Sequence, residues 1–262
     1  MTRPNRYSLA VALLGGVCHA AALLVLFESL AYTAVEATPW LGVFVLLAFV
    51  HGAVPALLSA HTRLLAPAGG LLVLFSIVAV ADLQGAGDPN LLEMYVMSVF
   101  TGITVGLVVF AGVLEFAIRR GYRLWAGRLR NLPPLPRPES GRRIAVGSAM
   151  GLVGLPAAIL GFLFGGPAAA LFVGLLATAA AAVPLLAVLR SGALTPLVPF
   201  ALVVPYVLYS HAFYMAEISG MGLFLLGPAA VLSALAWKVE RTVRSRIGGG
   251  GGTAFADRSD CG

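Results

Sequence analysis

Residues 167–189 read PAAALFVGLLATAAAAVPLLAVL, an apolar run without a single charged side chain. A helix of about 20 residues rises roughly 30 Å, which matches the hydrocarbon core of a bilayer. Runs of this kind recur along the whole chain, in which 60% of the residues are hydrophobic and 11% are charged. The sequence therefore predicts an all-α, polytopic membrane protein.

Eight apolar segments are predicted to cross the membrane. They are residues 8–34, 40–61, 67–83, 91–118, 144–165, 167–189, 194–216 and 220–237. The boundary between the fifth and the sixth rests only on Gly165, Gly166 and Pro167. The first segment is interpreted as an uncleaved membrane helix, because its apolar stretch is longer than the core of a signal peptide and no clean cleavage site follows it.

The basic residues predict the orientation. With a cytoplasmic N-terminus, the inner side collects Arg3, Arg6, Arg63, the arginines of 119–143, Arg190 and the basic residues of 238–246. The outer loops then hold Glu36, Asp82, Asp88 and Glu217, with no Lys or Arg. Eight crossings satisfy the positive-inside rule at every loop. We therefore expect a cytoplasmic-membrane protein with both termini in the cytoplasm, whose net charge of +6 requires no nucleic-acid partner.

An internal similarity predicts a duplication. Residues 53–67 read AVPALLSAHTRLLAP and residues 182–196 read AVPLLAVLRSGALTP, so Pro55 aligns with Pro184 and Pro67 with Pro196 at one offset. The first proline of each pair is expected to kink its helix, and the second to open the next one. We interpret the chain as two parallel four-helix repeats, residues 1–118 and 144–246, followed by a disordered Gly-rich tail over 247–262.

The segment between the predicted halves, residues 119–143, is strongly basic. Apolar residues recur there at three- and four-residue steps, at Tyr122, Trp125, Leu129 and Leu132. This spacing predicts a short amphipathic helix in the membrane interface, followed by a proline-rich linker, and the arginines favour anionic lipids. Glycines spaced four apart, at 102 and 106, 147 and 151, and 161 and 165, predict small-residue helix faces for packing within the chain or in a homo- or hetero-oligomer.

Ionisable side chains inside apolar segments are the candidates for function, because burying them in lipid is costly. His19 and His51 fall near the middle of the first two segments, so facing imidazoles on adjacent helices could relay protons or ligate a metal or a haem iron. Pro55 also leaves the carbonyl of His51 without its usual helical partner. The structural alternative is that His19 packs on the face of Gly15 and Gly16 and hydrogen-bonds a neighbouring carbonyl.

A second candidate group lies near the predicted outer surface. Glu28 and His211 are binding or proton-relay candidates, and His211 with Met215, one helical turn apart, is a candidate for a soft metal such as Cu(I). Residues predicted at the same depth are Tyr32, Glu93, Met94, Tyr95, Met97 and Tyr214. The tyrosines are equally explained by the preference of aromatic rings for the membrane interface. At the opposite surface, Glu115 and Arg119 are expected to form an ion pair.

No paired metal motif, phosphate-binding loop or nucleophile motif is present, which favours a non-enzymatic protein. Cys18 and Cys261 have neither disulfide nor metal spacing. The predicted function is a small-solute or ion permease, with proton coupling as a variant. Two alternatives stay open: a haem- or copper-binding redox or metal-handling protein, and a non-catalytic membrane assembly subunit. The sequence identifies no cofactor.

Overall fold

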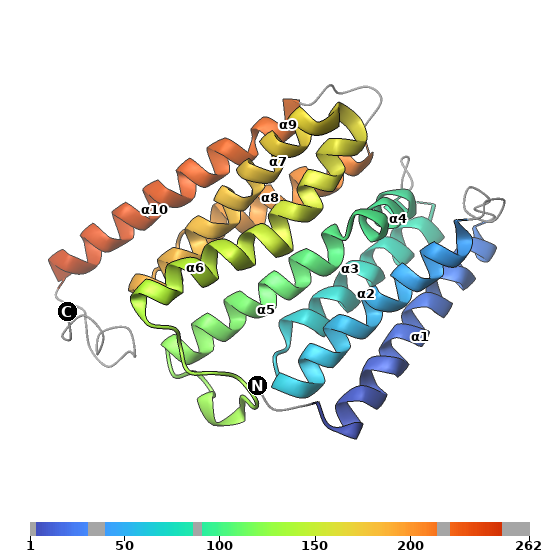
Figure 1. The fold of residues 1–262 in the computed structure, drawn as a ribbon, viewed down its shortest axis with the longest axis horizontal. Helices are drawn as coiled ribbons and strands as arrows, with labels where there is room; N and C mark the ends of the chain where they lie inside the picture. The colour runs from blue at the N-terminus through green and yellow to red at the C-terminus, as the bar shows by residue number, and fades with distance from the viewer. Residues whose placement is uncertain (1–3, 31–39, 86–90, 214–220, 248–262) are drawn as a thin grey trace. The chain divides into compact units, whose positions relative to one another are not determined.

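The computed structural model describes residues 4–30, 40–85, 91–213 and 221–247, and these residues are helical with short connections (Figure 1). The chain forms two compact units, Met1–Gly112 and Val113–Gly262. The all-α fold is therefore confirmed. Most of the predicted tail, residues 248–262, lies outside the described residues, as do Met215 and Glu217.

Helices occur in all eight predicted segments, and several of them have the length and composition of membrane spans. Within the described residues five spans qualify: α1 (Arg6–Ser29), α2 (Leu41–Thr62), α3 (Ala66–Leu83), and two stretches, Ser140–Leu163 and Gly165–Ser191, of the continuous α6–η2–α7 region. The bent pair α4 (Leu91–Thr101) and α5 (Ile103–Gly121) is a sixth if it forms one span. The shorter α8 (Leu197–Phe213), α9 (Met221–Phe224) and the charged α10 (Leu226–Ile247) complete the order. The apolar helices indicate a membrane location, and the number of eight crossings stays a prediction.

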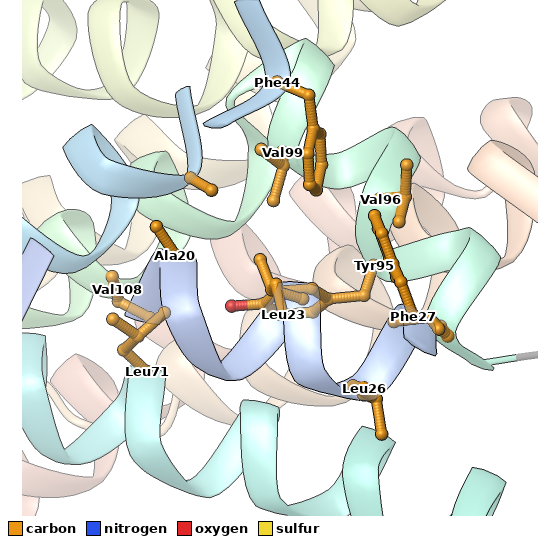
Figure 2. Close-up of a cluster of buried hydrophobic side chains, with 12 residues drawn as sticks. Ala20, Leu23, Leu26, Phe27, Phe44, Leu71, Tyr95, Val96, Val99 and Val108 are labelled. Carbon is orange, nitrogen blue, oxygen red and sulfur yellow. The ribbon is translucent and has the colours of Figure 1, made fainter. Parts of the chain in front are cut away.

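In the first unit α1 and α2 pack against each other through glycines. A Cβ atom placed on Gly52 would lie 2.4 Å from the carbonyl oxygen of Gly15 and 2.6 Å from the Cβ of His19. A Cβ on Gly16 would lie 2.6 Å from the ring of Phe49. Only glycine lets the two backbones come this close. The hydrophobic core forms beside this contact, around Leu23, Phe27, Phe44, Tyr95 and Val99 (Figure 2).

The fourth predicted segment is not one straight helix. α4 and α5 are bent by 74° at Gly102, whose φ of +77° lies in the left-handed region that favours glycine. The segment predicted as one crossing over 91–118 is therefore a bent pair of helices, and its single crossing stays a prediction. Asp82, at the end of α3, accepts hydrogen bonds from the backbone N–H groups of Leu91 (3.1 Å) and Leu92 (2.5 Å). A carboxylate there satisfies N–H groups that have no partner within α4 and holds its start beside α3.

In the second unit the chain runs along α6 (Pro138–Ala149), η2 (Met150–Gly154) and the first part of α7 (Leu155–Ser191), then reverses (Figure 1). Gly166 makes the reversal with φ +68° and ψ −163°, which confirms the predicted boundary at Gly165–Pro167. The two arms pack closely, since a Cβ on Gly161 would lie 2.9 Å from the carbonyl oxygen of Ala169. A Cβ on Gly147 or Gly151 would meet no described atom within 4 Å, so these two glycines make no contact face within the described chain.

The predicted interfacial helix over residues 122–132 is wrong. α5 ends at Gly121, and only the short 3-10 helix η1 (Ala126–Arg128) follows before the extended, proline-rich linker. Arg123, Trp125 and Asn131 have positive φ angles of 57°, 49° and 55°, which interrupt a helix. Contacts within the unit replace the helical pattern: the guanidinium carbons of Arg119 and Arg128 lie 5.4 and 5.7 Å from the centre of the Trp125 ring.

The four prolines of the proposed duplication occupy the expected kinds of position. Pro55 and Pro184 lie inside α2 and α7, Pro67 lies in the first turn of α3, and Pro196 directly precedes α8. The gap-free alignment would, however, place Val231, inside α10, opposite the helix break at Gly102. The duplication therefore stays a prediction.

Candidate functional site

His19 lies inside the first unit with partners from two other helices. Its Nε2 atom is 3.2 Å from the hydroxyl of Tyr95 in α4. Its ring packs edge-on against Phe75 of α3 and against Tyr95, with ring centres 5.3 and 5.9 Å apart. His19 does pack beside the α1–α2 glycine contact, but its hydrogen-bond partner is a tyrosine hydroxyl instead of the carbonyl in the structural alternative.

His51 is almost completely buried, with 2% of its surface exposed. Its Nδ1 lies 2.8 Å from the carbonyl oxygen of Leu47, so Nδ1 carries the proton and donates it to that oxygen. In the neutral ring Nε2 is then an acceptor. This atom is buried and has no hydrogen-bond partner within the described residues, and the backbone carbonyl of Ser98, another acceptor, is close enough to act on the ring. A buried acceptor without a donor is costly, so a hydrogen-bond donor that reached Nε2 would be bound favourably here.

The two histidines are brought together by the α1–α2 contact. Gly52, the residue after His51, meets the Cβ of His19, and a charge on one imidazole acts on the other. They form no direct hydrogen bond, since His19 contacts Tyr95 and His51 contacts Leu47. The backbones of α1 and α2 are also in contact at this level. This geometry leaves no space for a porphyrin between the two imidazoles.

Hydroxyl side chains surround the break between α4 and α5. The hydroxyl of Ser98 donates to the carbonyl oxygen of Tyr95 (2.6 Å) and lies 2.6 Å from the hydroxyl of Thr104. Thr101 donates to the carbonyl oxygen of Met97 at 2.9 Å, and all three hydroxyl residues are buried. The sequence reasoning missed these residues and the role of Tyr95. Their signal is the stretch SVFTGIT, residues 98–104, where three hydroxyl side chains surround a glycine in an apolar segment.

A hollow of about 330 Å³ reaches His19 from the side of the first unit. Its walls come from α1, α2 and α3 and are otherwise apolar apart from the thiol of Cys18: Gly15, Ala22, Gly52, Ala56, Ala68, Leu71, Leu72 and Phe75. The described residues make no hydrogen bond to Nδ1 of His19, whose Nε2 is taken by Tyr95. His19 therefore connects this hollow with the buried polar cluster.

The second candidate group is only partly described. Glu28 is exposed in the last turn of α1, and Glu93 is exposed on α4. His211 lies in α8 of the second unit, but its side chain is outside the description, as are Met215, Tyr32 and Tyr214. Tyr95 is buried in the core of the first unit (Figure 2), and its predicted depth near the outer surface stays a prediction. Among the described residues, no three His, Cys, Asp or Glu side chains are grouped closely enough to hold a metal ion.

The predicted pair of Glu115 and Arg119 is confirmed, with 2.6 Å between carboxylate and guanidinium. A further network, which the sequence reasoning missed, joins α10 to the α7–α8 connection. Glu240 accepts hydrogen bonds from the Thr195 hydroxyl (2.6 Å), the Thr195 N–H (2.9 Å) and the Leu194 N–H (3.3 Å), and pairs with Arg244. Arg244 donates to the carbonyl oxygen of Gly192 at 3.2 Å.

This network lies outside the predicted span 220–237 and shifts two titrations. Partial burial acts to raise the pKa of Glu240, but the hydrogen bonds from Thr195 and Leu194 and the charge of Arg244 outweigh it, so the pKa lies below its ordinary value. The hydrogen bond with the Tyr122 hydroxyl is the largest cause that raises the pKa of Arg244. The network holds helix ends together.

The first unit thus contains the candidate site. It consists of an acceptor nitrogen with no donor among the described residues, a second imidazole hydrogen-bonded to a tyrosine, and a helix break lined by hydroxyl groups. These groups can bind and transfer protons, and they offer no set of ligands that would hold a metal ion. Comparisons with models of protein families, with curated proteins and with solved structures each find no match.

Proposed function

We propose that the chain is a permease that moves a small solute or an ion across the membrane, with proton coupling through His51 and His19. The observation that carries this proposal is the buried Nε2 of His51, which has no hydrogen-bond donor among the described residues and lies beside a helix broken at Gly102. Broken helices inside a membrane are tolerated where they line a binding site or a water-filled path, and transporters use them to bind ions and substrates.

Proton binding would change the interactions at the break. Neutral His51 presents a lone pair at Nε2, near the carbonyl oxygen of Ser98. The protonated ring would instead present an N–H group that this carbonyl can accept, which strengthens the link between α2 and α4. Because α4 is short and joined to α5 only through Gly102, it is the element that can respond to this change.

The His19–Tyr95 pair supplies the proposed route for the proton. His19 borders the 330 Å³ hollow, and its Nε2 is hydrogen-bonded to Tyr95. Tyr95 lies about two helical turns before the helix break at Gly102. The imidazole can take up a proton at one nitrogen and release it at the other. In the proposed orientation both termini are cytoplasmic and the chain crosses the cytoplasmic membrane eight times, as the positive-inside rule favours.

Proton flux in proteoliposomes tests the proposal. The purified chain is reconstituted with a trapped pH-sensitive dye, and a potassium gradient with valinomycin supplies the driving voltage. We expect dye acidification above that of protein-free liposomes, and His51→Gln should reduce the rate to that background. His61→Gln is the matched control, because His61 also lies in α2 but near its end and away from the cluster.

Two results would contradict the proposal. Equal flux from the wild type and His51→Gln would make His51 structural. A wild-type rate equal to that of empty liposomes at every imposed gradient would remove the proton-coupled mechanism. Purified protein that carries stoichiometric copper or a haem absorption band would support the metal-handling alternative instead.

A further inference from the structure

Three arginines meet at one end of the second unit. Arg142 and Arg143 of α6 and Arg190 of α7 line a hollow of about 840 Å³, together with Val146 and Gly147. The hairpin explains their meeting, because Arg142 precedes the reversal at Gly166 by 24 residues and Arg190 follows it by 24. The two arms of the hairpin are equally long and run in opposite directions, so the chain returns to the same end; in Figure 1 one arm is α6 with the first part of α7 and the other is the rest of α7.

The hollow is strongly positive. The ion pairs that the structure describes, Glu115 with Arg119 and Glu240 with Arg244, use other arginines. The nearest acidic residue in sequence, Glu139, can offset only one of the three charges. Three guanidinium groups around one hollow repel one another unless an anion lies between them, and their planar N–H groups match the oxygens of a phosphate.

The position of the hollow favours a lipid over a soluble anion. One apolar span begins at Ser140 and the other ends at Ser191, so the arginines occupy the first and last turns of two membrane spans. Apolar side chains continue from the hollow along α6 and the start of η2 and stay exposed, namely Ile144, Val146 and Met150. A phosphate held by the arginines would leave acyl chains to lie along this apolar surface. Basic pockets between membrane helices are known to receive anionic headgroups in this way.

We propose that Arg142, Arg143 and Arg190 bind the phosphate of an anionic phospholipid headgroup. The site needs arginines from both arms of the hairpin. It therefore differs from a general attraction of anionic lipids to the basic residues of 119–143. It rests on the membrane location of α6 and α7 and is independent of permease activity.

Lipid binding to the full chain in detergent tests the site. Native mass spectrometry counts bound dioleoylphosphatidylglycerol, and thermal unfolding is followed with this lipid, with dioleoylphosphatidylcholine and with inorganic phosphate. For the wild type we expect one retained phosphatidylglycerol and a raised unfolding temperature with that lipid only. The double variant R142Q/R190Q should bind it at least about tenfold more weakly, since it loses charge-assisted bonds from both arms.

The matched control is R241Q/R246Q, which removes the same charge from two exposed arginines of α10. It should keep wild-type lipid binding. An equal loss of lipid binding in both double variants would show that lipid binding depends only on the overall charge, and it would overturn the site. A shift with inorganic phosphate as large as that with phosphatidylglycerol would overturn the lipid assignment, and retention of lipid by R142Q/R190Q would overturn the role of these arginines. Because the mass spectrometric count does not depend on stability, it remains informative if a variant unfolds at a lower temperature.

Discussion

The hydroxyl of Tyr95 lies 3.2 Å from Nε2 of His19, and this contact joins α4 to α1 across 76 positions of sequence. Both side chains are buried, and the hydrogen bond between them gives each of the two polar atoms a partner. The contact exists because the bend at Gly102 turns α4 into the core of the first unit. It links the fold of this unit directly to its proposed chemistry.

Removal of the tyrosine hydroxyl should therefore cost both stability and flux. Tyr95→Phe leaves Nε2 of His19 buried without its partner, and we expect a loss of about 1–3 kcal/mol in the free energy of unfolding. Denaturant unfolding in detergent measures this loss, and the dye assay measures the flux. Tyr206→Phe, at an exposed position of α8, should change neither quantity.

Replacement of His51 by an apolar residue should separate function from stability. His51→Leu removes a buried acceptor that has no donor in the described structure, so the free energy of unfolding should stay within about 1 kcal/mol of the wild type or rise. Proton flux should nevertheless fall to the background. A strong loss of stability in this variant, with its flux retained, would instead show that the imidazole is a structural group.

The contact between α1 and α2 should tolerate no side chain at Gly52. In Gly52→Ala the new methyl group would meet the backbone of Gly15 at 2.4 Å, and backbone cannot move aside cheaply. We expect destabilisation of about 1–3 kcal/mol, as for other overpacked positions. Gly42→Ala in the same helix is the control, because its methyl group would meet no described atom within 4 Å. Thermal unfolding of the two variants side by side measures the difference.

The helix break should require glycine at position 102. Alanine at φ +77° is strained by about 1–2 kcal/mol, so Gly102→Ala should either destabilise the first unit or straighten the α4–α5 junction. Both results should lower proton flux. Gly147→Ala, at an uncrowded position in α6, should leave flux unchanged. Flux at the wild-type level in Gly102→Ala would show that the bend is not needed for transport.

The Glu240 network should give a pH-dependent contribution to stability. The folded state lowers the pKa of Glu240, so the unfolded carboxylate takes up protons first as pH falls. The contribution is complete above the unfolded pKa, ordinarily about 4.5, and is lost as pH falls through the lower folded value. Unfolding temperatures between pH 7 and pH 3 should fall less steeply for Glu240→Gln than for the wild type.

Local signals of the sequence predicted some junctions and missed others. The reversal at Gly166 was predictable because two glycines and a proline interrupt the apolar pattern together. Gly102 has no glycine or proline beside it in its apolar run, and an isolated glycine is usually tolerated inside a helix, so its bend was missed. The prediction of an interfacial helix was wrong although its signal was present in the sequence. The contacts of Trp125 with Arg119 and Arg128 override a spacing that favours a helix.

The candidate site shows the same limit. His19 and His51 were predicted because ionisable residues stand out in apolar helices, and their mid-helix positions suggested a meeting. The burial of Tyr95 and its contact with His19 were missed, since they depend on a bend that no spacing rule predicts. Asp82 looked like a loop charge, but its carboxylate holds the start of α4 through Leu91 and Leu92.

His51 is the eleventh residue of a helix of 22 residues. In a bilayer, a proton that reaches its Nε2 from either surface therefore crosses about half of the transmembrane electric field. At about 2.3 kcal/mol per elementary charge for each 100 mV, half a crossing is worth about 1.2 kcal/mol. Under the proposed function, the membrane potential would thus change the proton-binding constant of this nitrogen about sevenfold for every 100 mV, so the depth of one side chain in its helix would make proton uptake voltage-dependent.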